Sequence, residues 1–455
     1  MAADKRNQSI RSAIWTSLLS KGGTALLQLL ALPVAMRVMG WEEFGLYASV
    51  AGLLITVQLF EVGLGPALTH GLSKAVAEGD RDRERALSAT AFFLLVGLAA
   101  AAFAVMAGMI IDLPVAWLFG EKFIPHEAAL RSAMWVGLVL FALMLVLNHT
   151  ERVREGYLEV RYNNMWGAAG NLLAAVMVFA GVWYVPTVSY LLLAVFGSGL
   201  LVKLGNTIHL WHTRPWLMPS WKWFRGGLAR WMLTDSVAYV VFAVVVNVVE
   251  FNVIQNLYGR IAGPVGVTGY SVLMTITVSA LGFVLMITTP TWPAVVDAKA
   301  RGDLPWIRRA ARRLWMYTAG FALCTGVGLI VFGPWLLPMW VGPKAQSLDR
   351  GVLVCYAVYF LAYVWRHANH MLLVGLGKVR ILAVVQIVES LLVLAAAWLG
   401  MNHGGLPELL LGMAAAIALV TGWCLPWLFH RDLRGAESAG TLRDMVKPVV
   451  VEAAT

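Results

Sequence analysis

Apolar and polar residues alternate in long blocks along the whole chain. Runs of 18 or more mostly apolar residues recur, and short polar segments separate them. Runs of this length are typical of helices that cross a lipid bilayer. Every connection is short, so no separate soluble domain is expected. The pattern predicts an all-α polytopic membrane protein with twelve spans, at 13–39, 45–70, 86–111, 131–150, 162–184, 188–211, 229–256, 266–294, 314–338, 350–375, 381–401 and 406–429.

The composition agrees with this pattern. Of 455 residues, 60% are hydrophobic and 13% are charged, whereas a soluble domain carries about a quarter charged residues. The first apolar segment follows a short basic N-terminus without a small-residue cleavage site, which favours an uncleaved signal anchor. Cys324, Cys355 and Cys424 all fall in apolar runs and are expected in the core, not in disulfides. No Cys/His cluster has zinc-ligand spacing, so we predict no metal and no cofactor.

Lysine and arginine set the expected orientation. Of the 35 basic residues, 26 belong to the N-terminus, the even-numbered connections and the C-terminal tail, and only five to the odd-numbered connections. The positive-inside rule then places both termini in the cytoplasm. The net charge of +10 faces the anionic inner leaflet, so no nucleic-acid partner is needed to explain it.

Two short motifs occur twice, with almost the same spacing between the copies. AVAEGDRDRERA (75–86) is followed in the second half by AKARGDLPWIRR (298–309), and GYLEVR (156–161) by GLGKVR (375–380). This predicts an internal duplication into two six-helix lobes of the same topology. Two such lobes facing a central cavity are typical of alternating-access transporters. The predicted parts are an N-terminal lobe (1–211), a cytoplasmic interfacial linker (212–228), a C-terminal lobe (229–429) and a cytoplasmic tail (430–455).

The first hairpin carries a family resemblance. MRVMGWEEFGLY (36–47) and SVAGLLITVQLFEVGLGPAL (49–68) lead into the Gly-Asp loop, and the later stretch NHMLLVGLGKVR (369–380) belongs to the same pattern. These blocks resemble the Wzx-like polysaccharide flippases of the multidrug/oligosaccharidyl-lipid/polysaccharide exporter (MOP) superfamily. Within them the matching positions are Arg37, Gly40, Glu42, Glu43, Phe44, Gly45 and Tyr47. His70 stands where relatives often carry a basic residue.

The resemblance implies a V-shaped pair of six-helix lobes. Such a protein moves undecaprenyl-pyrophosphate-linked oligosaccharide from the cytoplasmic to the outer leaflet for cell-surface polysaccharide, including lipopolysaccharide, biosynthesis. It implies a multi-pass protein of the bacterial cytoplasmic (inner) membrane, without a cofactor. Its partners would be the lipid-linked substrate, membrane lipids, and polysaccharide polymerase or assembly proteins. One chain with two lobes forms a complete pathway, so a monomer is expected.

Six ionisable residues lie inside the predicted spans at a similar depth. Each is six to nine residues from the cytoplasmic end, which corresponds to about 9–14 Å. Charged groups inside a membrane by default face a cavity or a partner. The basic members could hold a pyrophosphate, and the acidic ones could orient them or bind a coupling ion. Alternatively, the cations snorkel to headgroups and the carboxylates pair with them. The set comprises Lys21, Glu61, Lys203, Asp235, Arg366 and Glu389.

Other polar residues near the span ends are weaker candidates. Arg37 is expected near the outer interface, as a helix-end anchor or a substrate contact, beside a tight turn made by Gly40 and Gly45. Asn247 and Glu250, with Asn252 beside them, could bind sugar hydroxyls or form a solvated helix end. His367 and His370, next to Arg366, could titrate in a proton cycle or be hydrogen-bonded bystanders.

Three other classes compete with the flippase. An ion-coupled multidrug or small-molecule antiporter of the same superfamily would share the spans, but needs an acidic, aromatic cavity. A membrane glycosyltransferase or polymerase needs a substantial outer loop, and the longest, 112–130, has charges in no catalytic arrangement. A structural scaffold leaves the charged layer unexplained. The chain is therefore expected not to be an enzyme.

No ATP site is predicted. GLGK (375–378) lacks the spacing of a phosphate-binding loop. Outward movement of a pyrophosphate with two uncompensated charges would gain about 4–5 kcal/mol per 100 mV. Membrane potential or an ion gradient could therefore drive export.

Overall fold

The computed structural model describes residues 22–58, 64–234 and 249–435, apart from the side chains at 56–58, 249, 250, 290, 293, 300 and 379. Every regular element in these ranges is helical, and they contain no strand. By its backbone contacts the chain divides into two compact units. Unit 1 comprises Met1–Thr275 and Leu337–Ala345, and unit 2 comprises Ile276–Leu336 and Gln346–Thr455.

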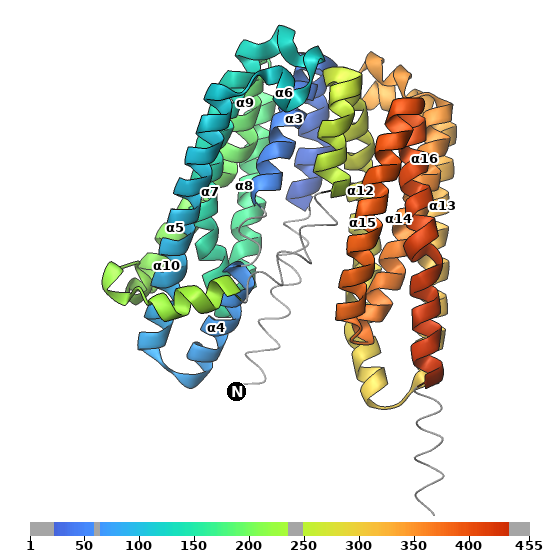
Figure 1. Cartoon of the computed structure of the whole chain (residues 1–455). Helices are drawn as coiled ribbons and strands as arrows, with labels where there is room; N and C mark the ends of the chain where they lie inside the picture. The colour runs from blue at the N-terminus through green and yellow to red at the C-terminus, as the bar shows by residue number, and fades with distance from the viewer. Residues whose placement is uncertain (1–21, 59–63, 235–248, 436–455) are drawn as a thin grey trace, which may run out of the picture. The chain divides into compact units, whose positions relative to one another are not determined.

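Unit 1 holds the helices of the first half and the start of the second. Within it, α5, α7, α8 and α10 run side by side (Figure 1). Helix α12 starts in unit 1 and continues into unit 2. The elements in chain order are η1 (Leu27–Ala31), α2 (Leu32–Met39), α3 (Trp41–Gln58), α4 (Leu64–Glu78), α5 (Arg81–Asp112), α6 (Val115–Phe119), η3 (Glu121–His126), α7 (Glu127–Gly156), α8 (Val160–Gly181), α9 (Val188–Leu192), η4 (Leu193–Gly197), α10 (Ser198–Thr213), η5 (Pro215–Leu217), η6 (Trp221–Trp223), η7 (Val249–Val253) and α12 (Ile254–Ala300).

Unit 2 contains the remaining helices, packed around an apolar core at one end. That core joins α12 and α13 to α14 and to the last helical residues, 423–435. Helix α16 packs against both α14 and α15. The elements are α13 (Leu304–Val341), whose last turn belongs to unit 1, η8 (Pro343–Ser347), which unit 1 shares up to Ala345, α14 (Arg350–Gly375), α15 (Val379–His403), α16 (Leu406–Ile417) and η9 (Ala418–Gly422).

The described helices confirm a multi-pass membrane protein. Ten helical stretches are long and apolar enough to cross a membrane. They coincide with the predicted spans except 45–70 and 229–256, which include residues outside the described ranges. Several helices extend beyond the predicted apolar runs; α13, for example, begins at Leu304 and not at position 314. Polar turns continue such helices into the interface, because the backbone hydrogen bonds stay satisfied there. The predicted lobe boundaries are not tested by these bounds.

Two one-residue turns show the internal repeat in the backbone. Gly40 separates α2 from α3 at φ 89°, and Gly263, at the corresponding place in the second half, interrupts α12 at φ 76°. Glycine populates positive φ without the steric cost of a side chain. The expectation that Gly45 also shapes this turn is wrong, because Gly45 lies within α3. A Cβ at Gly45 would overlap the carbonyl oxygen of Pro264, so glycine permits a backbone contact between helices.

The repeated Gly-Asp motif forms the same helix start twice. Gly79 and Gly302 have φ of 72° and 74°. The following Asp80 and Asp303 side chains each accept a hydrogen bond from the backbone N–H three residues later, at 2.9 and 3.0 Å. Such an N-cap satisfies a donor that the first helical turn leaves free. The motif is therefore a capped turn in both copies.

Four π-helical turns also recur in pairs. Leu27–Ala31 in the first half corresponds to Val249–Val253 in the second, and Leu193–Gly197 corresponds to Ala418–Gly422. The spacing within each pair is close to that of the sequence motifs. A π turn carries one extra residue within an α-helix and is rare. Its recurrence at corresponding places supports the duplication that the motifs predict.

Two arginines hold helix ends reciprocally within unit 1. The Arg37 guanidinium donates to the carbonyl oxygen of Trp340 at 3.1 Å, and its counterpart in the second half, Arg260, donates to the carbonyls of Trp117 and Leu118. Each arginine thus comes from one half of the sequence and binds a helix end of the other. Because the exposed Arg37 side chain binds backbone oxygens, its contacts are those of a helix-end anchor.

The linker predicted at 212–228 packs on the first turns of α5. The Arg81 guanidinium lies 4.1 Å from the ring centroid of Trp216, and that of Arg85 lies 5.3 Å from Trp223. The Trp216 indole N–H also donates to Glu84 at 3.3 Å. Cation–π contacts of this kind suit an interfacial segment rich in tryptophan.

Candidate functional site

One face of α14 carries five polar or aromatic side chains in a row. Their spacing of three and four residues places them on the same side of the helix. We call this set the polar face of α14. It consists of Tyr356, Tyr359, Tyr363, Arg366 and His370, and the first two are completely buried.

Ring contacts connect the members of this face. The Tyr359 ring centroid lies 6.4 Å from that of Tyr356 and 5.9 Å from that of Tyr363. The Arg366 guanidinium lies 4.6 Å from the Tyr363 ring centroid, within the range of a cation–π interaction. At the other end, the Tyr356 hydroxyl is 2.9 Å from that of Thr277 on α12. The tyrosines therefore form a continuous path of aromatic contacts that ends at the guanidinium.

Arg366 forms a buried ion pair with Glu389. An Arg366 nitrogen lies 2.6 Å from a Glu389 oxygen, and the two side chains are only 6% and 0% exposed. The hydroxyl of Thr421, on the π turn η9, donates to the other Glu389 oxygen. A buried charge is stabilised only when a partner and further hydrogen bonds replace its water. The Glu389 carboxylate is thus paired with the Arg366 guanidinium, which agrees both with a charge-orienting role and with simple local pairing.

The two histidines beside this pair are hydrogen-bonded. His367 Nε2 lies 3.2 Å from the hydroxyl of Thr288 on α12. His370 Nδ1 lies 2.7 Å from the Gln386 amide nitrogen on α15. Because an amide nitrogen only donates, Nδ1 of His370 accepts and carries no proton in this arrangement. These contacts connect α14 to two neighbouring helices.

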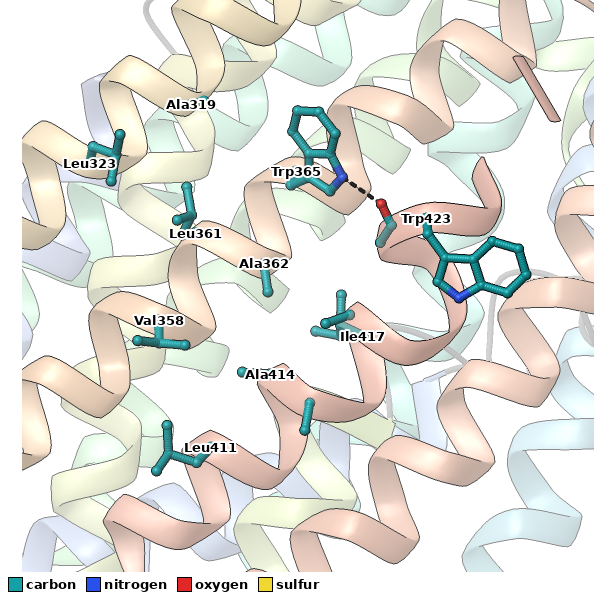
Figure 2. A pocket seen from close by; sticks show the side chains of 13 residues that line it. Ala319, Leu323, Val358, Leu361, Ala362, Trp365, Leu411, Ala414, Ile417 and Trp423 are labelled. Carbon is teal, nitrogen blue, oxygen red and sulfur yellow. Dashed lines mark hydrogen bonds between the residues drawn. The ribbon is translucent and has the colours of Figure 1, made fainter. Parts of the chain in front are cut away.

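An apolar cavity of about 920 Å³ lies beside this region, between α13, α14 and α16 (Figure 2). Trp365, next to Arg366 in sequence, lines it and donates from its indole N–H to the carbonyl of Gly422 at 2.9 Å. Apart from a second tryptophan, Trp423, the other lining residues are small or aliphatic, such as Leu323, Val358 and Leu411. The cavity therefore suits apolar groups, while the charged pair lies among the buried side chains of the bundle.

In unit 1, Lys203 pairs with Glu151. The ammonium on α10 forms an ion pair with the Glu151 carboxylate near the end of α7, and the side chains are 18% and 34% exposed. Thr150 and Thr207 join the same two helices through hydroxyls 2.8 Å apart. Lys203 is thus paired, like Arg366, but it is more accessible.

A denser network lies at the end of α7. Arg154 is fully buried and donates to Asn206 at 2.6 Å and to Glu159 at 3.1 Å. Glu159 also accepts from Arg214 at 2.7 Å. Burial opposes the positive charge of Arg214, but the hydrogen bond and negative charge of Glu159 outweigh it and raise the pKa of Arg214. This network ties α7, α10 and the linker together.

Three amide side chains gather at the π turn η7 and the first turn of α12. Asn252, Gln255 and Asn256 approach Gly52 on α3, where an added Cβ would lie 3.2 Å from the Gln255 amide nitrogen. That nitrogen donates to the carbonyl of Ala48 at 2.9 Å. Asn252 is buried, so it does not belong to a solvated helix end.

Several predicted site residues fall outside the described part of the chain. Lys21, Glu61, Asp235 and Asn247 lie there, and Glu250 is described only as part of the π turn η7. Of the charged layer, the structure brings together Arg366 and Glu389 and places Lys203 in a different unit. The aromatic members of the α14 face were missed. Their spacing in YAVYFLAYVWRHANH (356–370) was a visible signal.

Known proteins share this fold along nearly the whole chain. No protein-family model matches the sequence. A protein of Salmonella typhi named "Putative O-antigen transporter" is 21% identical over 439 residues, which cover 92% of this chain and 95% of that one. The structure of a multidrug resistance MATE family transporter of the MOP superfamily, in an inward-facing conformation, matches with a TM-score of 0.78 at 12% identity, covering 91% of this chain and 95% of that one. A MOP superfamily transporter from Pyrococcus furiosus matches at 0.66, also 12% identical, covering 94% and 97%. The chain therefore has the fold of MOP superfamily transporters.

Proposed function

We propose that the chain is a membrane transporter that flips an undecaprenyl-pyrophosphate-linked oligosaccharide from the cytoplasmic to the outer leaflet of a bacterial inner membrane. Three findings support this: the MOP transporter fold, the similarity to the protein named "Putative O-antigen transporter", and the buried cation of α14. Both termini would be cytoplasmic, and polysaccharide polymerase or assembly proteins would receive the product.

The Arg366–Glu389 pair is the observation on which the substrate class depends. A guanidinium engages two oxygens of a phosphate as it does those of a carboxylate. A pyrophosphate could therefore take the place of the Glu389 carboxylate, and Glu389 would rebind Arg366 after release. Such an exchange keeps the guanidinium paired throughout, and the displaced Glu389 carboxylate would keep its hydrogen bond from Thr421; a buried charge without any partner is strongly unfavourable.

The pairing of the described carboxylates favours an anionic substrate over a cationic one. Glu389 and Glu151 each bind a cation of their own unit. An antiporter for organic cations needs a carboxylate that can exchange its proton or coupling ion for the drug. Lys203 would offer a second, more accessible phosphate contact. Lys21, Glu61 and Asp235 keep their predicted roles, as cation and charge-orienting carboxylates.

A flipping assay in proteoliposomes tests the proposal. The probe is a fluorescent undecaprenyl-pyrophosphate oligosaccharide, whose exposure in the outer leaflet is measured with and without a membrane potential. We expect transport by the native chain and a loss of at least about tenfold in the double variant Arg366→Met/Glu389→Leu, which removes both charges together. The exposed Arg312→Gln serves as the control for loss of one arginine.

The outcomes separate the candidate functions. Transport that persists in the double variant would remove Arg366 from the substrate path. No transport of any lipid-linked oligosaccharide, together with proton- or sodium-driven uptake of an organic cation, would establish the antiporter instead. A potential that accelerates flipping would identify charge movement as the driving force.

A further inference from the structure

A second pocket, of about 390 Å³, lies between α12 and α13 in unit 2. Its size is that of a small ligand site. It shares no residue with the polar face of α14 or with the apolar cavity beside it. The lining residues are Ile287, Thr291 and Ala294 from α12, and Trp306, Arg309, Ala310, Arg313, Leu314 and Tyr317 from α13.

The pocket concentrates positive charge. Arg309 and Arg313 are one helical turn apart on α13, so their side chains occupy the same face. Within the described part of the chain, neither forms an ion pair with a carboxylate. Arg312, in the same RRAARR run (308–313), does not line the pocket. Two guanidinium groups in one concave surface, neither paired with a described carboxylate, attract an anion.

The remaining side chains suit a lipid headgroup. Counted along the helix, Arg309 and Arg313 lie about 8 and about 14 Å from the start of α13. That start follows the Gly-Asp turn that basic residues predict to be cytoplasmic, so both guanidinium groups can reach headgroup depth. Trp306 and Tyr317, at either end, are residue types enriched at membrane interfaces. Ile287 and Leu314 add apolar walls, which a soluble anion would not use.

We propose that this pocket binds the phosphate-bearing headgroup of an anionic lipid of the cytoplasmic leaflet. The two guanidinium groups donate to the phosphate oxygens in charge-assisted hydrogen bonds. The Thr291 hydroxyl donates to the carbonyl of Ile287 at 2.7 Å and can accept a hydrogen bond from the rest of the headgroup. The Tyr317 hydroxyl can donate or accept one, and the apolar walls contact the start of the acyl chains. The pocket shares no residue with the polar face of α14, so its lining can be altered without changing a residue of that face.

Native mass spectrometry of the full chain in neutral detergent tests this site. Phosphatidylglycerol and phosphatidylcholine are titrated separately, since both carry a phosphate but only the first has a net negative headgroup. We expect preferential binding of phosphatidylglycerol. Arg309→Gln and Arg313→Gln should each lower its affinity about fivefold, the factor for one basic side chain near an anionic lipid. The charge-matched Arg312→Gln should leave the affinity unchanged.

Other results would overturn the site. An equal loss in Arg312→Gln would show a diffuse charge effect, and equal binding of both lipids would show no anion recognition. Displacement of phosphatidylglycerol by inorganic pyrophosphate alone, at equal concentration, would assign the pocket to a soluble anion. Arg309→Lys is the control for misfolding, because it keeps the positive charge. This variant should bind phosphatidylglycerol more tightly than Arg309→Gln does. The proposal fails if it does not.

Discussion

Helices α7 and α14 occupy corresponding places in the two halves of the sequence but carry different chemistry. Aligned on the glycines that end them, Gly156 and Gly375, the polar face of α14 corresponds to positions 137, 140, 144, 147 and 151 of α7. Where α14 has three tyrosines, an arginine and a histidine, α7 has Gly137, Leu140, Met144, Leu147 and Glu151. Only the last of these is polar.

The features that the two halves share fix the backbone, whereas the features that differ are side chains of the candidate site. The positive-φ glycines, the Asp caps and the π turns recur in both halves, because each fixes a backbone conformation that few other residues allow. Side chains in the middle of a helix are not limited in this way, since the backbone bonds are made whatever the side chain. The middle of α14 can therefore carry Arg366 where α7 has Leu147, while both helices keep their form. The following experiments compare how much substitutions in the two halves change the free energy of unfolding.

The largest effect is expected at the buried pair of α14. Glu389→Ala leaves the Arg366 guanidinium buried without its carboxylate and should lower the free energy of unfolding by about 3–5 kcal/mol. The double variant Arg366→Met/Glu389→Leu should recover stability to within about 1 kcal/mol of the native chain, because no charge remains unpaired. Denaturant unfolding in mixed micelles measures both. A single variant as stable as the double one would contradict the comparison.

The next largest effect concerns the ring beneath the guanidinium. Tyr363→Leu removes the cation–π contact with Arg366 and should destabilise the chain by about 2 kcal/mol. At the corresponding position of α7, Met144→Leu should cost less than about 1.5 kcal/mol, since it exchanges similar apolar volumes. The same unfolding assay compares the two. Equal losses of unfolding free energy in the two variants would mean that the Tyr363 ring stabilises the chain only by filling space.

A smaller effect is expected for the ion pair of α7. Lys203→Met should lower the free energy of unfolding by about 1 kcal/mol or less, because the Lys203 and Glu151 side chains are 18% and 34% exposed and water screens them. High salt should remove most of this difference, but should not change the effect of Glu389→Ala. A loss above about 2 kcal/mol would show that this pair is as isolated from solvent as the one in α14.

The smallest effects should be equal in the two halves. Arg37→Gln and Arg260→Gln each remove exposed hydrogen bonds to backbone carbonyls at the reciprocal helix ends. Each should cost about 0.5 kcal/mol, at the low end for a hydrogen bond. Matched values from unfolding curves would confirm that these contacts belong to the shared scaffold. A difference above about 1 kcal/mol between them would not fit a duplicated anchor.

The sequence was sufficient for most of the fold. The apolar runs located ten of the described spans, and the Gly-Asp and Gly-x-x-x-Val-Arg motifs predicted turns that recur in the backbone. The assignment of Gly45 to the first turn failed, because glycine serves both turns and close helix packing. Only the approach of Pro264, from the other half of the sequence, distinguishes these two uses.

The candidate site was predicted less completely. Arg366 and Glu389 were both named, but their pairing depends on how α14 and α15 pack, which residue spacing alone does not give. Lys203 was grouped with them by depth, although its partner Glu151 was not foreseen. Depth along a helix follows from residue counting, whereas the direction of a side chain around the bundle requires the rotation of each helix.

Unit 1 is built from segments that lie far apart in the sequence, and this has a consequence for its synthesis. Arg37 binds a carbonyl at position 340, so the unit takes in segments from both halves of the described chain. At about 5–20 residues per second, the ribosome adds Trp340 roughly 15–60 s after Arg37. During that interval the early helices are in the membrane without their final contacts. The first half therefore completes its structure late, and a chain truncated before Leu337 should be a target for membrane quality control even though the described helices of the first half are all present.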